Sequence, residues 1–500
     1  MRNLSSSLVF FFARVAAAVL QLKLVDRFFG GQYAGLNALL NQLAFYVALI
    51  ELGLAAAAIS LLYEPIKSAN IEKTSGLLYA LQRDTTRLML LALPVIAALI
   101  YGYSRSLHTS LPSSVVIATL GLTALSGLVT LFSIHYQAYL NASEQIYQIH
   151  FVLGAGYLLK TGMGVALAVY FDNYLLLPVA IVAVTVAEVL TMKWRFHRSF
   201  PHYAARASRD HFVEIRTRAK FVLFHRVGGL IYYQSDFIIL SLVASLTLVK
   251  DYAQVQYAVA GLLGLSSAVF NALTASIARR QLDVSNDLRW RQYGAVIRIT
   301  YFLGICIVIA FVASAPAAVR LVFQGGELPQ RTFVLFGALL FLNLIKQVDD
   351  TFITATGVFH VAYYLPILES STYALLGILL ARRYGIEGIV MAGIATNLVF
   401  AVVAKSIVVA KGVFDGAVWR MALTKTTGLG LSLLLAIPVA LVFAFSRFMA
   451  MRAILQILVP NVLMAIYVIP IITAMVRRGY PKKLSIADQD EPVTLNRGAA

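Results

Sequence analysis

The residues of this sequence that are best suited to chemistry are charged side chains inside long apolar runs. Arg14, Lys160 and Arg226 are the deep cations. A charge at the centre of a bilayer costs on the order of 3 kcal/mol on insertion scales, so it normally faces protein or a water-filled space. Guanidinium and ammonium groups in such a place can neutralise an anion, and the planar fork of arginine suits phosphate oxygens. We therefore expect deep cations of this kind to face an interior path rather than lipid.

Four acids also lie within apolar runs: Glu51, Glu188, Asp236 and Asp349. An acid at that depth must be protonated, paired with a cation or in contact with water. We therefore expect each of these side chains to find a cation on another helix, to be protonated or to face water.

Three uncharged polar residues share helical faces with these charges or lie near them. Gln21 lies seven residues after Arg14, and Tyr233 lies seven residues after Arg226, which places each pair on one face of a helix. Asn41 begins the next apolar run. We expect Gln21, Asn41 and Tyr233 to line a polar path between helices.

The surroundings of Lys160 allow two interpretations. Gly156, Lys160 and Gly164 fall on one stripe of a helix. The two glycines either let a neighbouring helix approach closely or leave space for a bulky anion beside the lysine.

Two adjacent acids occur in the run 332–357. Lys346 and Asp350 are four residues apart, so we expect an internal ion pair between them. Asp349 is then the less satisfied acid of the two.

Composition and segment lengths place these residues in an all-α polytopic membrane protein. The chain has 500 residues, of which 60% are hydrophobic and 13% charged, and a soluble domain usually has about twice that charged share. A membrane-spanning helix needs about 20 apolar residues. The first apolar run is too long for a typical signal peptide and is expected to remain as a span. Fourteen runs qualify: 4–25, 36–62, 88–104, 115–140, 147–171, 174–194, 219–245, 253–278, 299–323, 332–357, 360–381, 387–410, 427–446 and 453–476.

The net charge of +18 does not indicate nucleic-acid binding, because the basic residues gather in loops on one side of the predicted spans. This bias places the N- and C-termini in the cytoplasm, with the basic loops against anionic membrane lipids. The longest of these loops interleaves basic and aromatic residues, a pattern more often lipid-facing than nucleic-acid-binding. The only cysteine, Cys306, lies within a span, which excludes a disulfide or a cysteine metal site within one chain.

The second half of the chain repeats the first. Arg14-Val15 aligns with Arg226-Val227 at an offset of 212, and Tyr33-Ala34 aligns with Tyr252-Ala253 at an offset of 219. Six spans in each half give both halves the same orientation, hence a parallel repeat around a central cavity. The expected domains are an N-lobe (1–197), a basic linker (198–218), a C-lobe (219–411), a final helix pair (412–478) and a disordered tail (479–500). The two predicted spans of the final pair, 427–446 and 453–476, carry no deep charge.

Sequence patterns typical of enzymes are missing. The chain has neither a phosphate-binding P-loop nor an H-E-x-x-H zinc motif, and its eight histidines show no metal-ligand spacing. No loop between spans is long enough for a catalytic domain, which disfavours a polysaccharide-polymerising or ligating enzyme. We expect a transporter without a cofactor or a metal.

Three segments resemble the polysaccharide and oligosaccharide flippases of the multidrug/oligosaccharidyl-lipid/polysaccharide exporter superfamily. They are YVALIELGLAAAAISLLYEPI (46–66), QSDFIILSLVASLTLVKDYAQVQYAVAGLL (234–263) and YGIEGIVMAGIATN (384–397). The resemblance covers about the first 410 residues. It implies two six-helix lobes around a cavity, alternating access, and a substrate of sugars linked to undecaprenyl pyrophosphate. For such a substrate, we expect Arg14, Lys160 and Arg226 to bind the pyrophosphate. We expect Glu51, Glu188, Asp236 and Asp349 to form ion pairs that break when the protein changes conformation, or to carry protons that couple transport to an ion gradient.

The resemblance also implies a cellular setting: flipping across the bacterial inner membrane during surface polysaccharide synthesis, beside a polysaccharide polymerase and glycosyltransferases. Two relatives in the superfamily remain alternatives. Lipid II flippases also have fourteen spans and intramembrane arginines. Multidrug/cation antiporters usually carry acids in the N-lobe cavity, which Arg14 and Lys23 of the first span disfavour.

Overall fold

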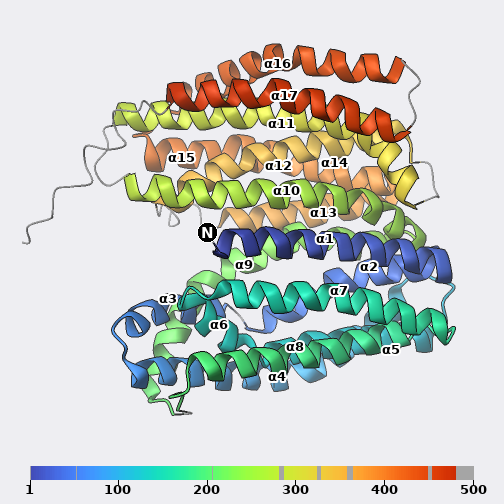
Figure 1. Ribbon diagram of the computed structural model, residues 1–500, viewed down its shortest axis with the longest axis vertical. Helices are drawn as coiled ribbons and strands as arrows, with labels where there is room; N and C mark the ends of the chain where they lie inside the picture. Colours follow the sequence, from blue (N-terminus) through green and yellow to red (C-terminus); the bar gives the residue numbers. More distant parts are fainter. Residues whose placement is uncertain are drawn as a thin grey trace, which may run out of the picture. The chain divides into compact units, whose positions relative to one another are not determined.

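The computed structural model describes residues 2–51, 53–204, 206–280, 286–323, 328–356, 364–448 and 453–479. Every regular element within these ranges is a helix (Figure 1). The predicted tail lies outside the described residues apart from Gly479.

The elements of the first 200 residues alternate long and short helices. They are α1 (Arg2–Phe29), α2 (Gly31–Val47), the 3-10 segment η1 (Ala48–Glu51), α3 (Leu54–Lys67), α4 (Ile71–Ser106), α5 (Ser113–Leu131), α6 (Ile134–Ala142), α7 (Ile146–Tyr170) and α8 (Leu176–Ser199).

The remaining elements begin with three helices of 35 residues or more. They are α9 (Arg209–Val243), α10 (Leu246–Arg280), α11 (Asn286–Phe323), α12 (Gln330–Thr356), α13 (Leu365–Tyr384), α14 (Ile386–Asn397), the π-helical η3 (Leu398–Ala404), α15 (Lys405–Val413), α16 (Val418–Phe448) and α17 (Ala453–Gly479).

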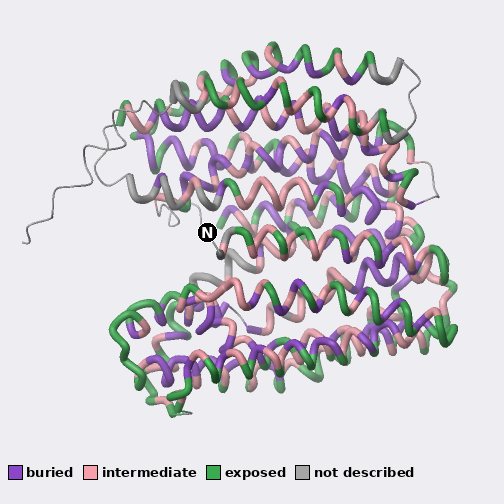
Figure 2. The backbone as a smooth tube through the Cα atoms, viewed as in Figure 1, coloured by how far each residue is buried: buried purple, intermediate pink, exposed green. Residues whose placement is uncertain are grey.

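The expected all-α polytopic membrane fold is confirmed. Within the described residues, 13 helical stretches are long and apolar enough to cross a membrane, and Val227–Val243 of α9 is a shorter apolar helix. Large apolar side chains are exposed along α4, α7 and α16 (Figure 2), for example Leu91 at 73% and Leu434 at 66%. Such faces suit contact with lipid tails, which are as apolar as leucine.

Two of the runs expected to form continuous spans are broken. The run 36–62 divides at Glu51: α2 ends in η1, and α3 begins after Gly53, whose φ of +76° is a left-handed conformation that favours glycine. The run 115–140 divides between α5 and α6 at Phe132 and Ser133. The sequence did not predict these breaks, because the few small and polar residues at them lie within otherwise apolar runs.

The basic linker predicted at 198–218 is partly helical. α9 starts at Arg209 and continues without a break into the apolar stretch, and a capping box between Ser208 and His211 begins the helix. Arg216 of α9 donates two hydrogen bonds, of 2.7 and 2.6 Å, to the carboxylate of Asp84 in α4. The hydrogen bonding with Asp84 raises the pKa of Arg216. The end of the linker is therefore attached to α4.

The chain divides into two compact units. The first contains Met1–Ala268, Val319–Leu339 and Ala362–Phe400, and the second contains Val269–Ala318, Leu340–Val361 and Ala401–Ala500. The lobe boundaries expected from the repeat remain a prediction, since a division by compactness does not test them.

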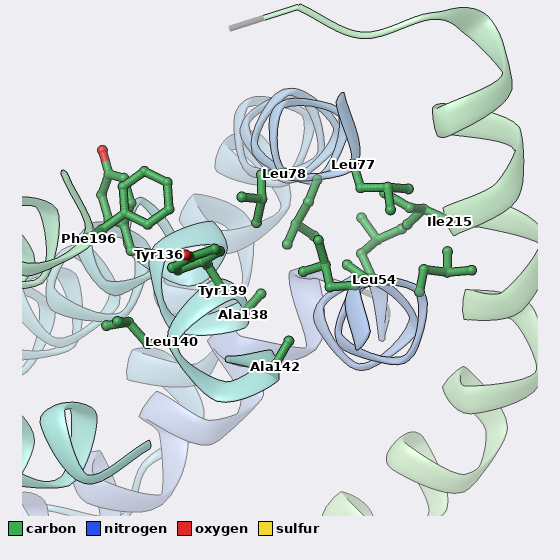
Figure 3. Close-up of a cluster of buried hydrophobic side chains, with 14 of the residues drawn as sticks. Leu54, Leu77, Leu78, Tyr136, Ala138, Tyr139, Leu140, Ala142, Phe196 and Ile215 are labelled. Carbon is green, nitrogen blue, oxygen red and sulfur yellow. The ribbon is translucent and has the colours of Figure 1, made fainter. Parts of the chain in front are cut away.

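In the first unit, a hydrophobic cluster joins the start of α9 to α3, α4, α6 and α8 (Figure 3). Leu54 and Leu77 face Ile215 of α9, and Tyr136 and Tyr139 pack their rings on Phe196 of α8. Along the same unit, α1 packs on α7, α7 on α8, and α9 on α13. These pairings position the charged residues described below.

In the second unit, a separate hydrophobic cluster connects α11 with α16 and α17. Phe302 and Cys306 of α11 pack among Val439 and Phe443 of α16 and Val468 of α17. Cys306 is a buried free thiol, as its position in a span predicts.

Candidate functional site

The first candidate site is a pair of cations around the ring of Tyr157 in α7. The guanidinium carbon of Arg14 lies 6.0 Å from the ring centroid, and Nζ of Lys160 lies 5.7 Å from it. The two cations are therefore within 11.7 Å of each other, the sum of these distances. Arg14 also lies 5.0 Å from the ring centroid of Phe45 in α2. Three helices, α1, α2 and α7, thus place two cations among aromatic faces, which stabilise positive charge.

Arg14 forms no salt bridge with any residue that the structure describes. Its neighbours are the rings of Phe45 and Tyr157 and the phenol of Tyr257 in α10, beside which Asn41 also lies. Arg14 is half-buried. A deep guanidinium with aromatic neighbours and without a carboxylate keeps its hydrogen-bond donors for a ligand.

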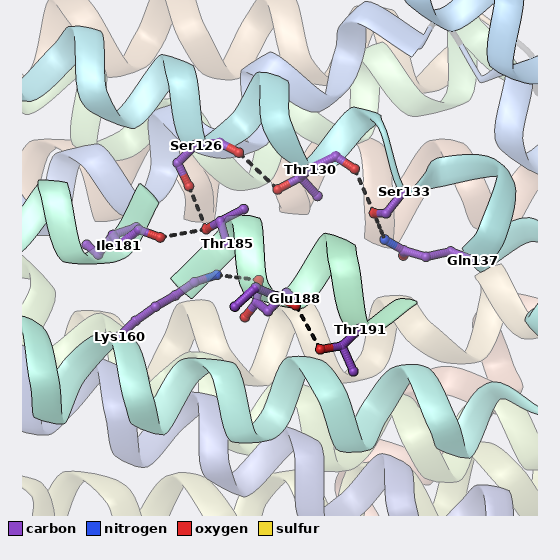
Figure 4. A network of polar contacts seen from close by, with 10 residues as sticks. Ser126, Thr130, Ser133, Gln137, Lys160, Ile181, Thr185, Glu188 and Thr191 are labelled. Carbon is purple, nitrogen blue, oxygen red and sulfur yellow. Dashed lines mark hydrogen bonds and ion pairs between the residues drawn. The ribbon is translucent and has the colours of Figure 1, made fainter. Parts of the chain in front are cut away.

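Lys160, in contrast, is paired with Glu188 of α8. Nζ lies 2.7 Å from Oε2 of Glu188, and Figure 4 shows the lysine side chain reaching across from α7. The side chains of Lys160 and Glu188 are 17% and 8% exposed. The structure therefore brings together a residue expected to bind substrate and one expected to couple transport.

The glycine stripe around Lys160 serves close helix packing. A β-carbon at Gly156 would lie 1.7 Å from Oε1 of Glu188, and one at Gly164 would lie 2.7 Å from Leu177. Both contacts are made to α8. Of the two interpretations from the sequence, the structure supports close approach of a neighbouring helix, with Glu188 filling the space beside Gly156.

A polar network continues from α8 to α5 and α6 (Figure 4). Thr185 of α8 is 3.0 Å from the hydroxyl of Ser126, and Gln137 of α6 donates to Ser133 at 2.8 Å. Ser133 lies at the break between α5 and α6, where it donates to the carbonyl of Thr130. The bond from Ser133 to Thr130 gives a partner to a backbone carbonyl at the break, and the other two contacts join polar side chains.

Gln21 and Asn41 both lie at the interface of the first two helices but have different partners. Gln21 is buried and donates to Oδ1 of Asn37 at 2.9 Å, and Thr161 of α7 lies 3.5 Å from it. Asn41 lies beside Tyr257. The structure thus brings Asn41 to the surroundings of Arg14 and places Gln21 in a buried amide pair.

The second candidate site surrounds Asp236 in α9. Its carboxylate accepts hydrogen bonds from the hydroxyls of Tyr252 in α10 and Tyr373 in α13, and all three residues are buried. Asn397 of α14 donates to the neighbouring Tyr232 at 2.5 Å. Among the described residues, Asp236 forms no salt bridge, so hydroxyl groups stabilise it rather than a cation.

The third candidate site, in the second unit, surrounds Asp349 of α12. This carboxylate pairs with Lys425 of α16 at 2.6 Å, and it accepts hydrogen bonds from Tyr293 at 2.8 Å and Ser406 at 3.3 Å. The expectation that Asp349 is poorly satisfied is wrong, because three donors surround it. Lys425 itself was not among the residues named from the sequence: it lies just before the predicted run 427–446, within the candidate span Val418–Phe445, and its side chain is only 13% exposed.

Asp350 has a partner that the sequence did not indicate, since it pairs with Lys405 of α15 at 2.6 Å. The expected ion pair between Lys346 and Asp350 stays a prediction. Lys405 follows the π-helical segment η3, whose extra residue per turn changes the faces of the residues after it. Because Lys405 and Asp350 lie on different helices, spacing along one helix could not predict their contact.

Three further residues named from the sequence lie apart from these clusters or outside the description. Glu51 is buried at the helix break, at the end of η1. Tyr233 is 50% exposed and contacts the ring of Tyr232 edge-on. The side chain of Arg226 lies outside the described residues, although its backbone belongs to α9.

The sequence interpretation missed a junction where α1 and α2 meet the start of α10. Lys250 lies 3.5 Å from Asp26 and 3.3 Å from Asp251, and a β-carbon at Gly35 would lie 1.7 Å from the carbonyl oxygen of Leu246. We call these residues, Asp26, Gly35, Leu246, Lys250 and Asp251, the α1–α10 junction. In the sequence, this junction is marked only by charged residues at the ends of predicted loops. Ordinary loops also carry such charges, so the pattern does not identify a junction between helices.

Within the described residues, no group of three or more His, Cys, Asp or Glu side chains could hold a metal ion.

Comparison with solved structures identifies the fold. The lipid II flippase MurJ, in an inward closed conformation, is similar with a TM-score of 0.69 and 13% sequence identity, over 95% of this chain and 98% of MurJ. A multidrug resistance MATE family transporter of the MOP superfamily is similar in its inward-facing conformation, with a TM-score of 0.60 and 12% identity over 84% of this chain and 99% of the transporter. An outward-facing multidrug resistance MATE family transporter of that superfamily is similar with a TM-score of 0.53 and 13% sequence identity, over 85% of this chain and 97% of the transporter.

No protein-family model matches the sequence, and a search of curated proteins finds no match. The structural likenesses show that the chain has the fold of MOP-superfamily transporters. At such low identity they show the fold alone and do not distinguish between members of the superfamily.

Proposed function

We propose that this protein is a flippase that moves an undecaprenyl-pyrophosphate-linked oligosaccharide across the bacterial inner membrane by alternating access. The observation that supports this proposal most directly is the placement of Arg14 and Lys160 near one ring, that of Tyr157, inside the apolar helices. A pyrophosphate with attached sugars cannot cross hydrocarbon unaided, because its charge would be buried without compensation.

Arg14 is the principal pyrophosphate ligand in this proposal. Its guanidinium has aromatic neighbours and no carboxylate partner among the described residues. It can offer two parallel N–H groups to one phosphate. Lys160 and Arg226 supply further positive charge, and Gln21, Asn41 and Tyr233 offer polar contacts to the sugar–pyrophosphate headgroup.

Coupling to an ion gradient is assigned to the buried acids. Asp236 is the strongest candidate, because it has hydroxyl donors and no cation partner among the described residues. It can therefore take up a proton or a small cation without breaking an ion pair. Glu188, Glu51 and Asp349 would change partners as the helices move.

A second candidate function is the flipping of lipid II, the peptidoglycan precursor. The similarity to MurJ over 95% of the chain favours it. Both candidates share the chemistry of a saccharide on a lipid pyrophosphate. A multidrug or cation antiporter is the third alternative, and the cationic surroundings of Tyr157 speak against it.

The proposed setting follows from the charge distribution. It places the N- and C-termini in the cytoplasm and the basic segments against anionic membrane lipids. The polysaccharide polymerase and glycosyltransferases that would use and supply the oligosaccharide are proposed only from the resemblance to oligosaccharide flippases. No enzymatic activity is proposed.

The test is binding and flipping of a lipid pyrophosphate by the purified full chain in vesicles. We expect Arg14→Ala to reduce binding of undecaprenyl pyrophosphate at least about tenfold, since a charge-assisted bidentate contact is lost. Arg27→Ala is the matched control, because Arg27 is also on α1 beside a ring, 5.7 Å from Phe28, at the exposed end of the helix. Equal binding by both variants and the wild type would refute the anion site.

Substrate choice requires a separate experiment in cells. Expression in a strain depleted of its lipid II flippase tests the second candidate, and expression in a strain lacking its surface-oligosaccharide flippase tests the first. Restored growth in one strain or restored surface glycan in the other identifies the saccharide class. A drug-accumulation change with neither effect would favour the antiporter.

A further inference from the structure

We infer that Glu188 is a built-in anion that occupies Lys160 until the substrate pyrophosphate displaces it, and that the displaced carboxylate then takes up one proton. The inference rests on the proposed function and deepens it, because it states how substrate binding and proton uptake are linked at one lysine. The residues that carry it are Lys160, Glu188, Gly156 and Arg14.

The two oxygens of Glu188 have different surroundings. Oε2 pairs with Lys160 at 2.7 Å, whereas Oε1 is buried and has no hydrogen-bond partner among the described residues. Gly156 provides the space for Oε1, since a β-carbon there would lie 1.7 Å from it. The carboxylate is therefore held in place by its ion pair and by packing, and it depends on one ammonium group for its charge.

Substrate and Glu188 must compete for that ammonium group. Lys160 and Arg14 both lie within 6.0 Å of the ring centroid of Tyr157, so an anion bound by Arg14 lies close to Lys160 as well. A pyrophosphate carries more negative charge than a carboxylate and attracts Lys160 more strongly at the same distance. Arg14, free of carboxylates among the described residues, gives the incoming anion its first contact.

A displaced Glu188 cannot remain charged where it is. It is 7% exposed as a residue, and removing its cation leaves an uncompensated buried charge, which is strongly unfavourable. Protonation removes that charge. In the balanced step, the contact between Lys160 and Glu188 breaks, a contact between Lys160 and a phosphate oxygen forms, and one proton passes from water to the Glu188 carboxylate. No covalent bond changes in the substrate.

The helices packed against α8 offer Glu188 no other ionisable partner. α7 contributes Lys160 and the phenol of Tyr157; its His150 lies against Ser6 and Phe10 of α1, and its other tyrosines, Tyr147 and Tyr170, lie at the two ends of the helix. α5 contains no ionisable side chain. The ionisable residues of α6, His135, Tyr136 and Tyr139, place their rings near Phe196, two turns beyond Glu188 towards the C-terminal end of α8. On α8 itself, the nearest charged residue in sequence is Lys193. The proton balance at this site is thus set by Lys160 and the ligand.

The experiment measures protons taken up when undecaprenyl pyrophosphate binds to the full chain in phosphatidylcholine nanodiscs. Titration calorimetry in two buffers of different ionisation enthalpy gives the number of protons bound per ligand. We expect about one proton for the wild type. Glu188→Gln should bind about tenfold more tightly and take up none, because the competing charge is gone. Glu64→Gln is the matched control, since Glu64 pairs with Lys73 at 3.7 Å at an exposed site, and it should behave as the wild type does.

The outcomes separate this inference from the proposed function. Binding that depends on Arg14 but involves no proton uptake, or unchanged affinity in Glu188→Gln, overturns the exchange at Lys160 and leaves the flippase proposal intact. Failure of the wild type to bind the lipid pyrophosphate at all overturns both. If Glu188→Gln does not fold, Glu188→Asp provides the test: its shorter side chain weakens the pair, so tighter binding with proton uptake retained is expected, and unchanged binding refutes the exchange.

Discussion

Gly156 and Glu188 fit against each other so closely that a β-carbon at position 156 would lie 1.7 Å from Oε1 of the glutamate. This relationship between α7 and α8 fixes where the carboxylate lies and therefore which oxygen meets Lys160. It also makes the site sensitive to a change of one methyl group.

Gly156→Ala is expected to push Glu188 away from Lys160 and to destabilise the protein by about 1–3 kcal/mol, the usual effect of overpacking. Thermal unfolding in detergent and lipid-pyrophosphate binding measure the two effects. Gly162→Ala is the control on the same helix, because a β-carbon at Gly162 meets nothing within 4 Å. Equal loss of stability in both variants would contradict the close contact. Glu188→Asp in the Gly156→Ala background should recover part of the stability.

Asp236→Asn is expected to preserve the fold and to abolish ion-coupled transport. The amide oxygen can still accept from Tyr252 or Tyr373, but the side chain can no longer gain or lose a proton. The measurement is substrate-driven proton or cation movement in vesicles, with Asp172→Asn, an exposed loop residue, as the control. Coupling equal to that of the wild type in Asp236→Asn would remove this residue from the coupling site.

Lys425→Met is expected to destabilise the second unit by about 3–5 kcal/mol, because it leaves the buried Asp349 carboxylate without its cation. Adding Asp349→Asn should recover much of the loss. Arg420→Met is the control on the same helix: Arg420 is 56% exposed at the side chain and lies 3.9 Å from an exposed Asp287. An unfolding temperature that falls as far in Arg420→Met as in Lys425→Met would contradict the prediction.

Arg216→Ala is expected to loosen the start of α9, because Asp84 loses two hydrogen bonds. The contribution is modest, about 1 kcal/mol, since the arginine side chain is 54% exposed. Hydrogen exchange at 209–220 measures it, with Arg218→Ala as the control. Because the pKa of Arg216 is raised in the fold, its contribution is complete below its unfolded pKa and fades only as the pH rises through the folded value. Its protonation should therefore add no pH dependence near neutrality.

Lys250→Ala is expected to open the α1–α10 junction, because Asp26 and Asp251 then repel each other without a cation between them. The measurement is labelling of Val249→Cys, a buried position, by a water-soluble maleimide in a Cys306→Ser background. Labelling of Cys at position 249 should be faster when Lys250→Ala is added than in the Val249→Cys, Cys306→Ser protein that keeps Lys250. Gly35→Val should act in the same direction by separating α2 from Leu246, whereas Gly102→Val, with open space around it, should not. Unchanged labelling would show that the junction is not a closing contact.

The sequence predicted the helical membrane fold and the deep charges well, because both depend on local composition. A charge in an apolar run is visible without knowing its neighbours, and Arg14, Lys160, Glu188 and Asp236 were found in this way. The partners were not visible, because a partner on another helix depends on packing and helix breaks. Lys405 meets Asp350 only after a π-helical segment, and Lys425 meets Asp349 across a separate helix. Neither pairing can be obtained from spacing along one helix.

The contact between Lys425 and Asp349 makes the last two helices, α16 and α17, necessary for the rest of the second unit. A shortened chain that ended before α16 would bury an acid with only Tyr293 and Ser406 as neighbours, and it would strip the apolar face of α11 that contains Phe302 and Cys306. A twelve-helix ancestor or descendant would therefore need a neutral residue at position 349 and a new surface on α11. The terminal pair is thus an integral part of this chain and not an appendage that could be removed without redesign.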